Sequence, residues 1–166
     1  MMQLGEAFVG SGPESAHINT VLGHREGPVG TAWATALATP REGHAAFVVV
    51  AQPNMPVKPF TVFVNKATIT TESHGRLHYG AAQLGVASGV LEAVSREIID
   101  ADLVENGVLI VAVWVDPAAE NEDLVFENNE AAVQQAFENG AKGDPSISDL
   151  LAIRDQPFNS YFIPNK

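Results

Sequence analysis

The chain has 166 residues, of which 46% are hydrophobic and 17% charged, and this composition predicts one folded domain with a hydrophobic core. Its net charge of −11 argues against binding to nucleic acids or anionic membranes, because both require clustered lysine and arginine. The lack of cysteine excludes a disulfide framework, a thiolate nucleophile and a cysteine zinc site.

Two features of the sequence bear on where in the cell the protein is located. Its longest apolar runs, near 45–51 and 108–115, are much shorter than a membrane-spanning helix. Residues 1–6 lack the basic start and apolar stretch of a signal peptide. We therefore expect a cytoplasmic protein.

The first half of the chain predicts four strands and one helix. Apolar patterns and turn residues place the strands at 3–9, 16–22, 44–51 and 60–69, and the helix between Pro28 and Pro40. His17 and Asn19 share one face of the second strand, because side chains alternate along a strand. Lys66 and Thr68 share a face of the fourth strand for the same reason.

The second half predicts a long helix, a strand and two further helices. Leucine or isoleucine recurs every seven residues over about 75–98, which indicates one helix. Three glycines inside it, Gly80, Gly85 and Gly89, each cost about 1 kcal/mol, so we expect close packing against another backbone. The remaining elements are a strand at 108–115 buried on both faces, a helix ending near 140 and a short helix over about 146–154.

The element order is ββαββαβα, followed by the short final helix. This order predicts an α+β domain, with one mixed sheet and helices on one face. We expect one domain over residues 1–166, and we assign no structure to the tail after about 156.

Histidine is the natural residue with which to search for chemistry, because its ordinary pKa of about 6.5 allows proton transfer near neutrality. His17 lies mid-strand among apolar residues. This position suits either a structural histidine held by hydrogen bonds or an acid–base group. His74 and His78 have the spacing of two metal ligands on one helix face, but no third ligand is evident. Two solvated histidines near a helix start are the favoured interpretation.

Lys66 and Gln83 are two further polar residues in apolar surroundings. An unpaired ammonium inside an apolar strand is unfavourable, so Lys66 either reaches a sheet edge or pairs with a carboxylate or a ligand anion. Gln83 is either a rim residue or a fixed amide that binds a heterocycle. Residue chemistry alone thus indicates an α+β domain with a candidate histidine-centred site.

Six short motifs follow one another in a fixed order along the chain. They are Gly5-Glu6-Ala7, Ala16-His17-Ile18-Asn19, Gly27-Pro28-Val29-Gly30, Pro53-Asn54-Met55-Pro56, Asn65-Lys66-Ala67-Thr68-Ile69 and Tyr79-Gly80-Ala81-Ala82-Gln83. Each is unspecific alone, but the ordered set, over about 3–140, resembles the formaldehyde-activating enzyme family.

The resemblance implies a hydro-lyase of one-carbon metabolism and methylotrophy. Its substrates would be formaldehyde and tetrahydromethanopterin, its products 5,10-methylenetetrahydromethanopterin and water, and no metal would be needed. The resemblance further implies a fold similar to the second domain of ribosomal protein S5, in a homopentamer with sites at subunit interfaces. His17 matches the family's proton donor. The positions that match pterin contacts of the family are Asn19, Val48, Lys66, Thr68 and Gln83.

Val48 stands where the family has Leu, a conservative change, and two other residues depart further from the family pattern. Asn19 stands where the family has Asp, and Ala81 where it has Pro. A carboxylate can accept two strong hydrogen bonds from an aminopyrimidinone edge, whereas Asn offers one acceptor and one added donor. We therefore expect weaker or altered activity. Two alternatives stay open, namely a non-catalytic paralogue that binds or senses formaldehyde or its pterin adduct, and a related enzyme acting on another carbonyl or reduced pterin.

Overall fold

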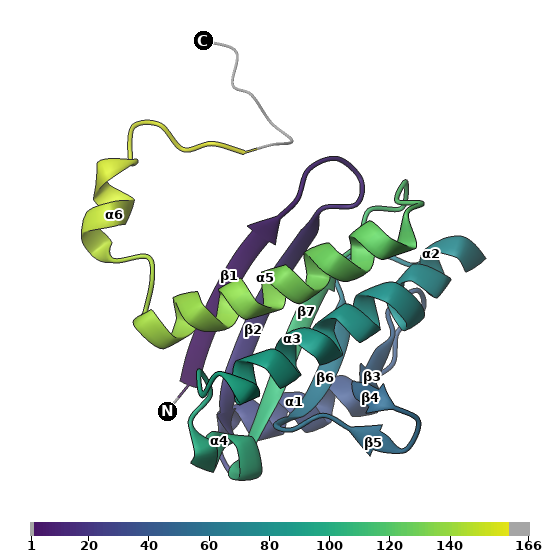
Figure 1. Ribbon diagram of the computed structural model, residues 1–166, viewed down its shortest axis with the longest axis horizontal. Coiled ribbons are helices and arrows are strands. Elements are labelled where there is room, and N and C mark those ends of the chain that lie inside the picture. The colour runs from purple at the N-terminus through teal and green to yellow at the C-terminus, as the bar shows by residue number, and fades with distance from the viewer. Residues whose placement is uncertain (1, 160–166) are drawn as a thin grey trace.

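A five-stranded mixed sheet forms the centre of the molecule (Figure 1). The structure is a computed structural model and describes residues 2–159. The strand order is β1-β2-β7-β6-β3, in which β6 and β7 run parallel and the other pairs antiparallel. The strands are β1 (Met2–Val9), β2 (Ala16–His24), β3 (Ala46–Val48), β6 (Phe60–Asn65) and β7 (Gly107–Trp114), and β4 (Val50–Gln52) pairs separately with β5 (Met55–Pro56).

Two long helices, α3 (Gln83–Ser95) and α5 (Glu122–Lys142), lie side by side across one face of the sheet (Figure 1). The helix α2 (Glu72–Leu77) leads into α3 through one π-helical turn, His78–Ala82. The shorter helices are α1 (Pro28–Ala38), α4 (Ala101–Asn106) and α6 (Ile147–Ala152). Of the described helices, none combines the length and hydropathy that crossing a membrane requires.

The hydrophobic core lies between the sheet and the helices α3 and α5. On β2, burial alternates strictly from Ala16 to Val21, so that Ile18 contributes to the core with Phe137 of α5. His17 and Asn19 therefore point to the opposite face of the sheet, as the alternation predicts. α1 packs behind the sheet in Figure 1, towards the end where β2 finishes, and leaves the His17 end of this face accessible.

The α+β class and the mixed sheet with α3 and α5 on one face are confirmed, although α1 lies on the other face, and the remaining differences are local. The predicted strand at 44–51 is divided at the buried Val49, and the strand at 60–69 ends at Asn65, so Lys66 and Thr68 follow the strand. The strand at 108–115 is not buried on both faces, because α1 covers only part of the second face. α4 was not predicted, and residues 160–166 of the tail lie outside the described residues.

Candidate functional site

Four polar side chains gather on the sheet face opposite the core: Glu6, His17, Asn19 and Lys66. The antiparallel register of β1 and β2 places Glu6 opposite Asn19. Directly opposed residues share a face, so the hairpin brings three of these side chains to one side. The fourth comes from the end of β6, across the intervening strand β7.

The imidazole of His17 is accessible and lies beside a carboxylate. Its Nε2 atom is 2.9 Å from Oε1 of Glu6, and the His17 side chain is 38% exposed. Protonation of the ring makes this contact an ion pair. The neighbouring strands place Phe8 and Trp114 opposite His17, and the Phe8 ring centroid lies 6.1 Å from that of the imidazole. A ligand that reaches His17 would therefore meet aromatic side chains next to an imidazole.

Lys66 joins the group through Asn19. Its backbone N–H donates a 2.8 Å hydrogen bond to the carbonyl of Val113, which holds it beside β7 after β6 has ended. Its Nζ atom donates a 2.7 Å hydrogen bond to Oδ1 of Asn19. Burial lowers the pKa of Lys66 to about 8, and the negative charge of Glu6 opposes that shift. Within one chain, Lys66 is thus bonded to a neutral amide rather than to a carboxylate.

Gln83 lies on α3, among the helices that cover the core face, and not beside His17. Its Oε1 atom accepts a 2.8 Å hydrogen bond from the backbone N–H of Val50, and the residue is almost fully buried. It lines a cleft of about 610 Å³ with Tyr79, Leu84 and Phe126 among others. This cleft has the aromatic and aliphatic walls that suit a planar heterocycle.

Val48 and Thr68 lie towards the β3 edge of the sheet, away from β1. Val48 is half-buried in β3, opposite Val62 of β6, and β7 and β6 separate β3 from β2. Thr68 is exposed in the segment after β6, close to Gly43. One chain therefore brings together His17, Asn19 and Lys66, and it leaves Gln83 in a separate cleft.

Sequence reasoning missed Glu6 as a site residue. The signal that could have found it is the hairpin itself, because pairing the first two predicted strands around the turn at 10–13 sets Glu6 opposite Asn19. Phe8 would have followed from the same register, opposite His17.

The interpretation of His74 and His78 as solvated was wrong, because both lie in the core with exposures of 1% and 0%. His74 Nε2 donates to the carbonyl of Val115, and His78 Nδ1 donates to the carbonyl of His74. The other ring nitrogen of each has no hydrogen-bond partner in the described protein, and burial lowers the pKa of His78. Within residues 2–159, no group of three or more possible metal ligands was found.

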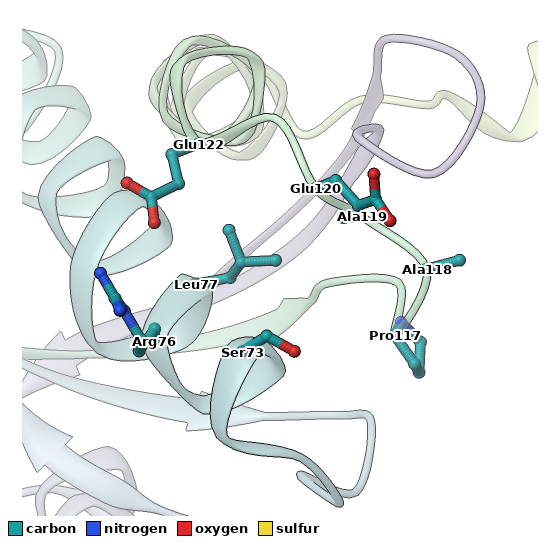
Figure 2. A pocket seen from close by; sticks show the side chains of 8 residues that line it. All are labelled: Ser73, Arg76, Leu77, Pro117, Ala118, Ala119, Glu120 and Glu122. Atoms are coloured by element: carbon teal, nitrogen blue, oxygen red, sulfur yellow. The ribbon is translucent and has the colours of Figure 1, made fainter.

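A second cleft, of about 400 Å³, lies between α2 and the segment that leads from β7 into α5 (Figure 2). Arg76 and Leu77 line it from the α2 side, and Glu120 and Glu122 from the α5 side. None of the predicted site residues lines this cleft, so the candidate chemistry stays with the His17 cluster.

Comparison with known proteins relates most of the chain to one family. The family model described as formaldehyde-activating enzyme matches residues 4–162. The 5,6,7,8-tetrahydromethanopterin hydro-lyase of Methanosarcina barkeri is 38% identical over 152 residues, which cover 92% of this chain and 85% of that protein. The bifunctional enzyme Fae/Hps of Methanosphaera stadtmanae is 39% identical over 154 residues, and this chain spans only 38% of its length. The protein belongs to the formaldehyde-activating enzyme family.

Proposed function

We propose that this protein condenses formaldehyde with tetrahydromethanopterin to give 5,10-methylenetetrahydromethanopterin and water. Family membership supports the reaction class, and a relative named as the hydro-lyase supports the pterin. The observation that carries the proposal is the accessible imidazole of His17, which lies beside a carboxylate and on the same sheet face as an amide-bonded lysine.

In the first step one pterin nitrogen adds to the formaldehyde carbon, and its proton moves to the oxygen to give a hydroxymethyl amine. In the second step the carbon–oxygen bond breaks, and a proton from His17 lets the oxygen leave as water. The second pterin nitrogen then bonds to the carbon and releases its proton, which restores the imidazolium of His17. The balance is one formaldehyde and two N–H groups consumed, one methylene bridge and one water formed.

The need for His17 follows from the leaving group, because hydroxide leaves poorly and water leaves well. General acid catalysis supplies about 10²–10⁴-fold in rate, and positioning of formaldehyde beside both nitrogens adds to it. Lys66 and Asn19 offer donors and an acceptor to the polar edge of the pterin.

A complete pterin site needs two copies of the chain. His17 and Gln83 lie on opposite sides of the sheet, so a ligand that touches both bridges one copy's His17 face and another copy's Gln83 cleft. The exposed apolar residues Met2, Leu4 and Phe8 on the β1 edge support such an interface. We propose a homopentamer with shared sites, and a monomeric mass in light scattering would contradict it.

The test is the rate of condensation of formaldehyde with tetrahydromethanopterin. We expect the protein to accelerate it and His17→Ala to abolish the acceleration. His24→Ala is the matched control, since His24 ends the same strand, is similarly exposed and faces Asp102 instead. A wild-type protein that leaves the uncatalysed rate unchanged would refute the proposal.

The neutral side chain of Asn19 favours a second candidate function, which is binding of formaldehyde or its pterin adduct without turnover. Tight calorimetric binding of the methylene adduct, together with an absence of catalysis, would support it. A third candidate, catalysis with another reduced pterin or carbonyl, is tested by comparing tetrahydrofolate with tetrahydromethanopterin under identical conditions.

A further inference from the structure

The charges around His17 are unevenly distributed. Two basic groups, His17 and Lys66, share one surface, and the residue between them, Asn19, is neutral. Asn19 accepts a hydrogen bond from Lys66 but cannot balance its charge. An uncompensated ammonium that is half removed from water is unfavourable, so the site needs a nearby anion.

Glu6 is placed to be that anion. It stands directly opposite Asn19 on the neighbouring strand, and its Oε1 atom is 2.9 Å from His17 Nε2. Its charge also acts on Lys66. Among the described residues, no other carboxylate forms an ion pair with His17, and Lys66 forms none.

We propose that Glu6 is a positioning residue of the site, which orients the imidazole of His17 and supplies the negative charge that Asn19 lacks. The inference rests on the proposed function as far as His17 is the proton donor. The carboxylate does not touch the reacting atoms. It acts by holding Nε2, which leaves Nδ1 as the ring nitrogen open to a ligand, and by favouring the charged form of Lys66.

The competing explanation is an ordinary surface ion pair, since Glu6 is 61% exposed and such pairs contribute little. The two explanations differ in what depends on Glu6. A surface pair affects at most stability, whereas a positioning carboxylate affects turnover and the titration of Lys66. The geometry favours the second, because the carboxylate of Glu6 contacts the ring of His17 and stands opposite Asn19, the residue that binds Lys66.

The experiment compares Glu6→Gln with the double variant Glu6→Gln/Asn19→Asp. In Glu6→Gln we expect kcat to fall about tenfold, which is less than the roughly 10²–10⁴-fold that general acid catalysis supplies as a whole, while KM and the thermal midpoint change little. The pKa of Lys66, followed by NMR titration, should fall below its starting value of about 8. In the double variant the new carboxylate should restore both kcat and the Lys66 titration in large part.

The matched control is Glu105→Gln, which removes a carboxylate of similar exposure, 64% against 61%, from its ion pair with Lys58. It should leave kcat and the Lys66 titration unchanged. If Glu6→Gln also leaves both unchanged, Glu6 is only a surface residue and the inference is overturned. If Asn19→Asp restores neither, the inference that Glu6 supplies the charge that Asn19 lacks is overturned. The Lys66 titration does not require turnover, so a failure of the proposed reaction remains distinguishable from a failure of the charge assignment.

Discussion

The Nζ atom of Lys66 lies 2.7 Å from Oδ1 of Asn19, so a half-buried cation is bonded to a neutral acceptor. Burial disfavours the charged form and lowers the pKa of Lys66 from 10.5 to about 8. In the unfolded chain the ammonium regains its hydration and its ordinary pKa. Near neutral pH, the charged lysine therefore reduces the stability of the fold.

Replacing this lysine should stabilise the protein. We expect Lys66→Met to raise the free energy of unfolding at pH 7 by about 1 kcal/mol, less than the pKa shift alone suggests because solvent screens the half-exposed ammonium. Between pH 8 and 10.5 the unfolded wild type binds more protons than the folded one, so wild-type stability rises with pH and the gain from the variant shrinks.

Urea denaturation of Lys66→Met and wild type at pH 7, 9 and 10.5 measures this difference. Lys58→Met is the control, since the exposed Lys58 is paired with Glu105 and its replacement should give no such gain. A Lys66→Met protein that is less stable than wild type at pH 7 would contradict the argument. The same variant should bind the pterin more weakly, which separates stability from function.

Acid should destabilise the protein through the buried ring of His78. Burial lowers the pKa of His78 below its ordinary 6.5, so the unfolded chain takes up a proton first as the pH falls. The stability associated with the neutral ring is therefore complete above pH 6.5 and is lost progressively below it. One such group contributes a slope of at most about 1.4 kcal/mol per pH unit.

His78→Met should flatten this dependence, because methionine cannot titrate and fills a similar volume in the core. Unfolding free energies measured from pH 7.5 to pH 5 give the slope for each protein. His44→Ala, which removes an exposed histidine, should retain the wild-type slope. Parallel curves for wild type and His78→Met would rule out His78 as the source.

The sequence predicted which residues share a face but not which strands become neighbours. The period of two places His17 and Asn19 together from the sequence alone. The bond between Asn19 and Lys66 depends instead on the strand order β2-β7-β6, which brings in a strand more than forty residues further along the chain. Alternation along β2 contains no information about that order.

The buried histidines show a different limit of sequence reasoning. A spacing of four residues places His74 and His78 on one side of a helix, but it does not tell whether that side faces solvent or core. In the structure the side is buried, and backbone carbonyls of Val115 and His74 satisfy one nitrogen of each ring. The same limit applies to Gln83. The sequence places it on a helix, but it does not show that β4 packs beside it and forms the cleft.

The glycines of the long helix give a test of helix packing. A Cβ atom on Gly85 would lie 2.5 Å from the carbonyl oxygen of Phe126 on α5, and one on Gly89 would lie 2.8 Å from that of Glu130. The expected close packing is confirmed at these two positions. It is wrong for Gly80, where no atom from outside its own stretch of helix lies within 4 Å of the added carbon.

We therefore expect opposite effects of alanine at two positions. Gly85→Ala forces α3 and α5 apart and should lower the free energy of unfolding by about 1–3 kcal/mol. Gly80→Ala meets open space and removes backbone freedom from the unfolded chain, so it should be neutral or raise stability by up to about 1 kcal/mol. Chemical denaturation of both variants is the measurement, and equal losses would show that the contact with Phe126 is unimportant.

Gln83 tests whether the apolar cleft belongs to the pterin site. Its Oε1 atom is used by Val50, while Nε2 has no hydrogen-bond partner among residues 2–159 and remains available to a ligand. Gln83→Ala should raise KM for the pterin about three- to tenfold, the value of one hydrogen bond, with little change in kcat. It should also lower stability by about 1 kcal/mol, because the N–H of Val50 loses its acceptor.

Gln52→Ala is the matched control for this effect, since Gln52 lines the same cleft but is exposed and bonded only to Met55. It should leave KM near the wild-type value. Steady-state kinetics with varied pterin concentration compare the two variants. Because His17 lies on the other side of the sheet, a KM effect confined to Gln83, together with loss of activity in His17→Ala, would mean that one pterin contacts two copies of the chain. Equal KM values in all three proteins would instead restrict pterin binding to the His17 face.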